Sequence, residues 1–240
     1  MHEHLAIIMD GNGRWARRRG RARWFGHIAG AAAARRVVEG AVRADVGTLT
    51  LFAFSTENWR RGDREVRTIM ATVRRWLRAE RATLEREGIR LTHIGDLDGV
   101  PESLAATVRA CEAATAANDR MTLVLALNYG FRADVVRAVR AVVDAGIVAS
   151  EAAVKARLST AALPDVDLLV RTGGEERVSN FVLWEAAHAR LRFIDTLWPD
   201  MTEAGIRALL RDHRGHARHD GEVPDAAPAG GRHDVTETVS

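Results

Sequence analysis

The chain has 240 residues, of which 47% are apolar and 28% are charged, so it is long enough to bury the core of one ordinary domain. Its 35 Lys and Arg residues against 32 Asp and Glu give a net charge of only +3, and no basic block, RNA motif or zinc-ligand spacing supports a nucleic-acid partner. Because no stretch approaches about 18 apolar residues and the N-terminus lacks a signal-peptide layout, we expect a cytoplasmic protein that neither spans a membrane nor is exported.

Six short apolar runs, each bounded by polar residues or glycine, are predicted to be strands at residues 5–9, 49–54, 89–94, 122–127, 166–170 and 191–194. Between them, apolar residues return at helical spacing over residues 29–46 and 65–87. Strand–helix alternation of this kind predicts an α/β fold, in which a six-stranded, mostly parallel sheet is flanked by helices and covered on both faces. The single cysteine, Cys111, falls in a helix-like run and is interpreted as a buried apolar residue rather than a nucleophile.

The last part of the chain, from about Asp212, loses its apolar periodicity and gains Pro, Gly and His. We therefore predict one domain over residues 1–211 and a disordered polar tail over residues 212–240. The four histidines of this tail are irregularly spaced, so they are interpreted as solvated side chains rather than metal ligands, and His2 and His4 are treated in the same way.

Polar groups and glycines follow the predicted strands where each one ends. Residues 10–14 follow the first strand, 55–61 the second, 95–96 the third, 128–130 the fourth and 171–179 the fifth. Ligands of open parallel sheets bind beyond the carboxyl ends of the strands, so these segments should share one rim. The rim is rich in arginine, hydroxyl groups and glycine, which bind phosphate through guanidinium forks and backbone N–H donors.

Each rim segment also has a simpler interpretation. A turn with two glycines can be a tight strand-to-helix connection, and Asp10, Ser55 or Thr56 can be helix caps. Arg171 and Arg177 can pair with the two neighbouring glutamates in a surface network of little energetic value. The turn has neither the GK[ST] of a P-loop nor GxGxxG, and no Ser/His/Asp or Cys/His pattern appears. Several anion-binding signals on one rim nevertheless favour a shared phosphate or diphosphate site.

Ordered motifs along the chain resemble the cis-prenyltransferases. They are HLAIIMDGNGRWARRRG at 4–20, GHIAGA at 26–31, AFSTENWRR at 53–61, ALNYG at 126–130, RTGGEERVSNFVLW at 171–184 and LWPD at 197–200. The resemblance covers about residues 4–211. It implies a homodimer whose subunits each hold a six-stranded sheet and a hydrophobic tunnel. It also implies an enzyme that joins isopentenyl diphosphate to an allylic diphosphate, forms a Z double bond and releases pyrophosphate.

The resemblance also implies roles for individual residues. Asp10 would hold Mg²⁺ and assist the departure of the diphosphate, and Asn58 would lie near the proton that is lost. The allylic diphosphate would be bound by the first segment, with Trp15 packed beside it: Gly11, Asn12, Gly13, Arg14, Arg23 and His27. The space between the two substrates would be shaped by Ser55, Thr56, Glu57, Trp59 and Arg61. Isopentenyl diphosphate would be bound by Arg171, Arg177, Val178 and Ser179.

The chain departs from the family pattern before its last strand. Arg190 stands where the family has a glutamate that completes the magnesium site across the dimer, so the second acidic ligand is in question. Glu185 could replace that glutamate or could be a helix-surface acid, and the Arg190 cation could instead replace the charge of the metal. In addition, His188 and Arg192 replace tyrosines, and Phe131 replaces a glycine.

These departures leave three functional alternatives open beside a regular long-chain synthase. The chain could be a short-chain synthase, an irregular one that couples allylic units differently, or a catalytically weak scaffold subunit of a heteromeric enzyme. Trp76, on the long predicted helix, could block growth of the product or be an ordinary core tryptophan. Contact between the enzyme and a bilayer surface would be chemically sensible for an apolar product.

Overall fold

The computed structural model describes residues 3–220, and its centre is a sheet in the order β3-β4-β2-β1-β5-β6. Every neighbouring pair of strands is parallel. The prediction of a six-stranded parallel α/β sheet is therefore confirmed, with each strand within three residues of its predicted bounds. The strands are β1 His4–Ile8, β2 Thr48–Ser55, β3 Ile89–Ile94, β4 Met121–Tyr129, β5 Leu168–Thr172 and β6 Arg190–Ile194.

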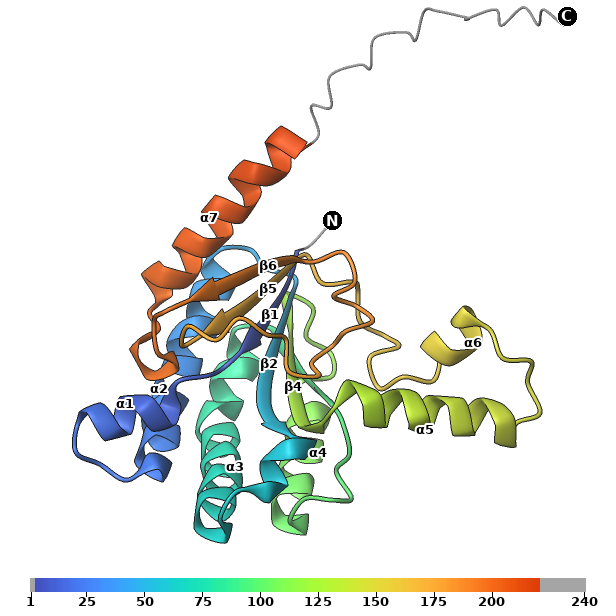
Figure 1. Cartoon of the computed structure of the whole chain (residues 1–240), viewed down its shortest axis with the longest axis horizontal. Helices are drawn as coiled ribbons and strands as arrows, with labels where there is room; N and C mark the ends of the chain where they lie inside the picture. Colours follow the sequence, from blue (N-terminus) through green and yellow to red (C-terminus); the bar gives the residue numbers. More distant parts are fainter. Residues whose placement is uncertain (1–2, 221–240) are drawn as a thin grey trace, which may run out of the picture.

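Helices connect these strands, as Figure 1 shows. The α-helices are α1 Asn12–Arg18, α2 Arg23–Arg43, α3 Asp63–Arg86, α4 Glu102–Thr115, α5 Phe131–Asp144, α6 Glu151–Lys155 and α7 Glu203–Asp220, and the short 3₁₀ helices are η1 Thr56–Arg60 and η2 Trp198–Asp200. The prediction for α3 was close, but α2 begins six residues before its predicted start at residue 29. Gly26 and Gly30 interrupt the apolar pattern of its first two turns and so hid this beginning.

The two faces of the sheet are covered differently. One face packs against α2, α3, α4 and α7 and forms the larger core, which includes Leu49, Leu77 and Val108. The other face is covered by the start of α5 and mainly by the irregular segment 173–189, whose Phe181 stacks on Phe52 at a ring distance of 4.3 Å. The expectation that both faces are covered is confirmed, although one of them is covered mainly by irregular chain.

The carboxyl-terminal helix α7 continues to Asp220, so the predicted boundary at residue 211 falls inside a helix. Its polar second half shows no apolar period, but it is held by Arg214, which donates a hydrogen bond to Glu3 at 2.7 Å and another to the Ala44 carbonyl. Three of the four tail histidines lie on this helix, and one of them, His213, approaches Glu3 at 3.4 Å. Residues 221–240 and His2 lie outside the described residues.

Two further expectations concern buried residues. Cys111 on α4 is 1% exposed, as predicted, and burial raises the pKa of its thiol. His4 is buried and hydrogen-bonded to Thr50 at 2.7 Å and to the Pro164 carbonyl at 2.9 Å, which explains it as a structural residue. Within residues 3–220, no helix is both long and apolar enough to cross a membrane.

The topology predicts where a ligand binds. The connection after β1 leads to β2 on one side, whereas the connection after β5 leads to β6 on the other. A crevice therefore opens between the carboxyl ends of β1 and β5, which is the usual binding position in such sheets. The pairing of β2 with β4 shifts its register between Phe52 and Ser55, at the carboxyl end of β2.

Candidate active site

The turn after β1 is built by close backbone contacts. Gly11 has φ 103°, a conformation that favours glycine, and precedes α1. Helix α2 lies so close to this turn that a Cβ on Gly26 would be 1.9 Å from the Asn12 carbonyl oxygen, and one on Gly30 would be 2.5 Å from Asn12 Oδ1. The glycines of the GHIAGA motif thus allow α2 to hold the DGNG turn in place.

Asp10 lies at the centre of a charged network at the crevice. Its Oδ2 accepts a hydrogen bond from Arg171 Nη2 at 2.8 Å and lies 3.5 Å from Arg14, while Oδ1 accepts from the Gly11 N–H at 2.6 Å. Burial alone would raise the pKa of Asp10, but the hydrogen bonds from Arg171 and Gly11 and the nearby cations outweigh it and hold the pKa below its usual value. The carboxylate is therefore ionised and already oriented.

Arg171 connects this carboxylate to the loop after β5. The side chain is only 4% exposed, and its Nη1 donates to the Arg177 carbonyl at 2.7 Å and to Ser179 Oγ at 2.6 Å. Ser179 has φ 48° and Asn180 has φ 61°, so the loop holds its hydroxyl group in an uncommon backbone conformation. Arg171 is thus a buried arginine paired with a partly exposed Asp10 and does not pair with the neighbouring glutamates, whereas Arg177 does pair with Glu175 at the surface.

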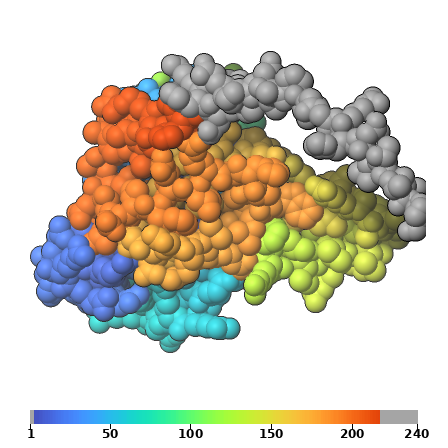
Figure 2. All heavy atoms as spheres, turned by 45° about the horizontal axis from the view of Figure 1, so that its top comes forward, coloured from blue at the N-terminus to red at the C-terminus, as the bar shows by residue number. Residues whose placement is uncertain are grey.

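The segment after β2 places Asn58 beside the same crevice. Ser55 and Asn58 form a capping box at the start of η1, in which Asn58 Oδ1 accepts from the Ser55 N–H at 3.2 Å. Glu57 accepts from Asn180 Nδ2 at 2.8 Å, which ties this segment to the loop after β5. In Figure 2, the segment after β5 lies between the α1 turn and η1 on one face of the molecule.

Glu65, in the first turn of α3, contacts two arginines and a histidine, of which two lie on α2 and the third directly follows η1. It lies 3.0 Å from His27, 2.7 Å from Arg61 and 3.4 Å from Arg23. The hydrogen bond to His27 and the Arg61 guanidinium outweigh partial burial and lower the pKa of Glu65 to about 2. The sequence analysis missed Glu65, and its only local signal was the position four residues after Arg61.

Two cavities open at this network and share a wall. The first has a volume of about 150 Å³ and is lined at its mouth by Asp10, Asn12, Gly13, Arg23, His27, Asn58 and Arg61. The second, which we call the clamp cavity, measures about 500 Å³ and is lined by residues that include Ser55, Glu57, Arg171, Arg177, Ser179 and Asn180. Met9, Asp10, Phe52, Asn58 and Arg61 line both.

Other predicted residues lie outside these linings. Arg14 contacts Asp10 from behind, and Gly11 contributes through its backbone. The Trp15 indole donates to Asp200 at 2.6 Å, the Trp59 indole donates to Asn128 at 2.8 Å, and Val178 packs in the smaller core. Thr56 lies beside Gly130. The ends of β3 and β4 contact each other there and support Trp59, so they contribute to neither cavity.

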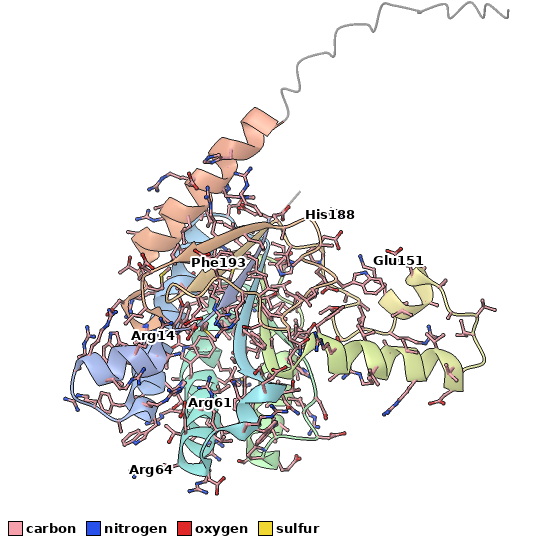
Figure 3. The ribbon with its side chains drawn as sticks, viewed as in Figure 1. Arg14, Arg61, Arg64, Glu151, His188 and Phe193 are labelled. Atoms are coloured by element: carbon pink, nitrogen blue, oxygen red, sulfur yellow. The ribbon has the colours of Figure 1, made fainter. Side chains whose placement is uncertain are left out.

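The structure separates Arg190 and Glu185 from this site within one chain. Arg190 pairs with Leu168 and through it with Leu5, so it lies about 16 Å below Asp10 along the strand direction. Figure 3 places the nearby His188 at the far side of the sheet from Arg14 and Arg61. Glu185 is 2% exposed and accepts a hydrogen bond from Thr160, and burial raises the pKa of its carboxyl. The expectation that Glu185 is a helix-surface acid is therefore wrong, and a role as a second metal ligand across a dimer stays a prediction.

The donor set at Asp10 limits how a cation could bind. Among residues 3–220, no three His, Cys, Asp or Glu side chains lie close enough together to hold a metal ion. Asp10 is 32% exposed at the shared wall of the two cavities, and both its oxygens already accept hydrogen bonds. A cation at this wall would therefore have no ready-made cluster of three such ligands within residues 3–220.

Comparisons with known proteins agree on one family. Residues 8–221 match the family model described as "Putative undecaprenyl diphosphate synthase". The isoprenyl transferase of Caulobacter vibrioides is 43% identical over 95% of this chain and 91% of its own, and that of Wolinella succinogenes is 40% identical over 92% and 97%.

Two solved structures resemble the fold closely. The lavandulyl diphosphate synthase of Lavandula x intermedia, in complex with dimethylallyl diphosphate, has a TM-score of 0.84 and 33% identity over 88% of this chain and 94% of its own. A probable undecaprenyl diphosphate synthase of Campylobacter jejuni has a TM-score of 0.77 and 29% identity over 92% and 99%. The chain therefore belongs to the undecaprenyl diphosphate synthase family, the cis-prenyltransferases, and is a prenyltransferase that condenses prenyl diphosphates.

Proposed function

We propose that the two cavities bind the two substrates of the condensation, an allylic diphosphate in the smaller cavity and isopentenyl diphosphate in the clamp cavity. Asp10, Asn58 and Arg61 line both cavities and support this assignment, because two diphosphate-bearing molecules could bind there side by side, each in its own cavity. Backbone N–H groups of the DGNG turn with Arg23 and His27 bind the allylic diphosphate, and Arg171, Arg177 and Ser179 bind the other.

The reaction follows from this arrangement. The allylic C–O bond breaks, pyrophosphate leaves with the electron pair, and the alkene of isopentenyl diphosphate attacks the allylic cation. A proton is then lost, near Asn58, from the isopentenyl carbon next to the new cationic carbon, which forms the new double bond. The Arg23 and Arg61 guanidinium groups that Glu65 holds in place stabilise the charge that develops on the leaving group, and they need no reorganisation during the reaction.

We also propose that the enzyme uses Mg²⁺ at Asp10. A single carboxylate fits this ion, because Mg²⁺ commonly keeps several waters and takes its other ligands from substrate phosphates. When bound, Mg²⁺ would supply positive charge to the leaving diphosphate. Arg14 and Arg171 orient the Asp10 carboxylate toward the shared wall, so the site does not depend on an acid at position 190 of the same chain.

A homodimer is our third proposal, and the exposed face of α5 supports it. Val136, Val139 and Val143 share that face and are 50%, 39% and 67% exposed. Figure 1 shows α5 and α6 extending away from the sheet, so this face is accessible to a second copy. The mass of the protein in solution tests it. The cytoplasmic location and the membrane contact stay predictions.

A short-chain or irregular synthase is the second candidate. The similarity to the lavandulyl diphosphate synthase and the small volume of the first cavity favour it, because about 150 Å³ suits a short allylic tail. The intact charged network argues against a pure scaffold subunit, which would need no oriented carboxylate at the shared wall.

The deciding experiment incubates the purified protein with isopentenyl diphosphate and dimethylallyl, geranyl or farnesyl diphosphate, each with Mg²⁺ and with EDTA. We expect pyrophosphate release and a Z-prenyl product only with Mg²⁺. Coupling of dimethylallyl diphosphate with itself would instead identify an irregular synthase. No product with any primer would refute the proposed function, and full turnover in EDTA would refute the proposed metal.

A further inference from the structure

Asn180, in the loop after β5, connects three segments around the clamp cavity. Its side-chain Nδ2 donates to Glu57 Oε1 on η1 at 2.8 Å, and its Oδ1 accepts from the Arg132 N–H in the first turn of α5 at 2.9 Å. Its backbone carbonyl accepts from the Phe131 N–H at 2.9 Å. Figure 2 shows the start of α5 beside the segment after β5. One residue therefore fixes how η1, α5 and this loop lie relative to one another.

The start of α5 needs Asn180 because the helix has no cap of its own. Gly130 precedes the helix and provides no side-chain hydrogen bond to it. A Cβ on Gly130 would be 2.4 Å from Thr56 Oγ1 and 2.9 Å from Asn180 Nδ2, so no side chain fits at this position. The first N–H groups of a helix have no partner inside it, and Asn180 satisfies two of them. The helix in turn anchors the loop after β5.

The amide of Asn180 has one orientation that satisfies both of its side-chain contacts. The Arg132 N–H is a donor and needs the amide oxygen, whereas an ionised Glu57 carboxylate accepts and needs the amide nitrogen. Burial raises the pKa of Glu57, but hydrogen bonds, first among them the one from Asn180, outweigh it and hold the pKa below its usual value. Glu57 is therefore ionised at neutral pH, and the amide cannot turn over without losing both contacts.

The position of Glu57 matters because the rest of the clamp cavity suits an anion. Arg171, Arg177 and Ser179 line this cavity with donors, and Glu57 adds a carboxylate to the same lining. A carboxylate that moved toward a bound diphosphate would repel it, because like charges interact strongly where water is partly excluded. The hydrogen bond from Asn180 holds this carboxylate in one place.

Asn180 also supports the hydroxyl group beside it. Ser179 has φ 48° and Asn180 has φ 61°, so two successive residues adopt the left-handed conformation, which asparagine accepts better than most residues. Such backbone persists only where surrounding contacts hold it. The contacts of Asn180 with η1 and α5 supply that support, and they keep Ser179 Oγ at 2.6 Å from Arg171 Nη1.

We infer that Asn180 is a positioning residue for isopentenyl diphosphate, which holds Glu57 and Ser179 in place around the clamp cavity through its contacts with η1 and α5. This inference rests on the proposed function. In the described part of the chain, Asn180 lines the clamp cavity but not the smaller cavity. Its loss should therefore weaken the binding of isopentenyl diphosphate and leave that of the allylic diphosphate nearly unchanged.

The first test measures the steady-state kinetics of Asn180→Ala with each substrate varied in turn. We expect KM for isopentenyl diphosphate to rise about 10- to 100-fold, because hydrogen bonds to a charged group and to a helix start are lost, while KM for the allylic diphosphate changes at most about threefold.

The matched control is Asn118→Ala. The Asn118 side chain also holds backbone in place, since it donates to the Leu84 and Ile89 carbonyls at 3.1 and 2.9 Å, but it lines neither cavity. Both KM values should stay at the wild-type level in this variant. Equal changes in the two KM values of a folded Asn180→Ala protein, or no change in either, overturn the inference.

The second test exchanges donor and acceptor. Asn180→Asp can still accept from the Arg132 N–H, but it places two carboxylates in contact, so KM for isopentenyl diphosphate should rise at least as much as in Asn180→Ala. In the double variant Asn180→Asp/Glu57→Gln, the new amide donates to the new carboxylate. The hydrogen bond returns with its direction reversed, and the net charge of the pair equals that of the wild type.

We expect this double variant to recover about tenfold or more of the KM that Asn180→Asp loses. A double variant with no recovery overturns the inference, and this comparison decides even if Asn180→Ala does not fold.

Calorimetric binding of isopentenyl diphosphate alone separates this inference from the proposed function. If the wild type condenses the substrates but Asn180→Asp binds isopentenyl diphosphate as tightly as the wild type, the proposed function holds and the role of Asn180 fails. If no primer is condensed but binding weakens in Asn180→Asp and returns in the double variant, the role of Asn180 holds and the proposed function fails.

Discussion

The charged mouth of the 150 Å³ cavity and its inner end at Trp76 are organised in different ways. At the mouth, the carboxylates of Asp10 and Glu65 each contact several basic side chains, through contacts that span up to 161 residues of sequence. At the inner end, Trp76 is the only one of residues 3–220 that lines both this cavity and a neighbouring one of about 240 Å³. A carboxylate with several partners keeps its position when one contact is lost, whereas one substitution at Trp76 changes the shape of the cavity. We therefore expect substitutions at the mouth to alter the reaction rate and substitutions at Trp76 to alter the length of the product.

The largest effect is expected for Asp10→Asn. Asparagine can still accept from the Gly11 N–H, but it leaves Arg171 and Arg14 without their counter-charge and removes the proposed ligand of Mg²⁺. Pyrophosphate release should fall about 100- to 1000-fold, as when a charge-stabilising group is removed from other active sites. Product length should not change. Asp98→Asn, at a side chain that is 95% exposed, is the control, and a loss below tenfold would contradict the role of Asp10.

A smaller and more selective effect is expected for Arg171→Lys. Lysine keeps the charge but cannot contact Asp10, the Arg177 carbonyl and Ser179 from one rigid fork. We expect KM for isopentenyl diphosphate to rise about 10- to 100-fold, while KM for the allylic diphosphate changes only a few-fold. Steady-state kinetics with each substrate varied in turn measure this. Arg90→Lys, at an exposed arginine, is the control. Equal changes in both constants would show that the two sites are not separate.

The smallest effect concerns Glu65 and the dependence of stability on pH. Its pKa is lowered from 4.5 to about 2 in the folded chain, so its ion pairs stabilise the fold above pH 4.5, and this stability is lost as the pH falls toward 2. The free energy of unfolding of the wild type should exceed that of Glu65→Gln by about 1–3 kcal/mol at pH 7. This difference should shrink below pH 4.5.

Urea unfolding at a series of pH values measures this difference. The matched control is Glu85→Gln, whose carboxylate is 41% exposed and pairs with Arg81 on the same helix. A constant difference down to pH 2.5 would refute the lowered pKa. A change of product length in Glu65→Gln would show that the mouth of the cavity also affects the product, contrary to the comparison above.

Much of the fold could be predicted because its signals are local. Short apolar runs between polar residues located all six strands, and the segments after β1, β2 and β5 were correctly expected on one rim. The early start of α2 was missed because Gly26 and Gly30 serve contacts with Asn12, which no helical period reveals. The polar half of α7 was missed for a similar reason, since Arg214 stabilises it through Glu3, 211 residues away.

The site could be predicted only in part. Motifs identified Asp10 and Arg171, but the role of Glu65 depends on His27, which comes from a helix 38 residues earlier. Glu185 was misplaced because sequence position does not show that it is buried against Thr160. Trp76 was known to lie on a long helix, yet its position between two cavities depends on how α2 and α3 pack.

By itself, the sequence determined the strands, the longer helices and the rim of arginines and glycines, because hydrogen-bond geometry repeats over a few residues and leaves a period in the chain. Only the tertiary structure decided that β5 lies beside β1, which brings Arg171 to Asp10, and that Trp76 divides the space beneath them. Strand order and helix packing are set by the burial of surfaces far apart in sequence, and this leaves no local pattern.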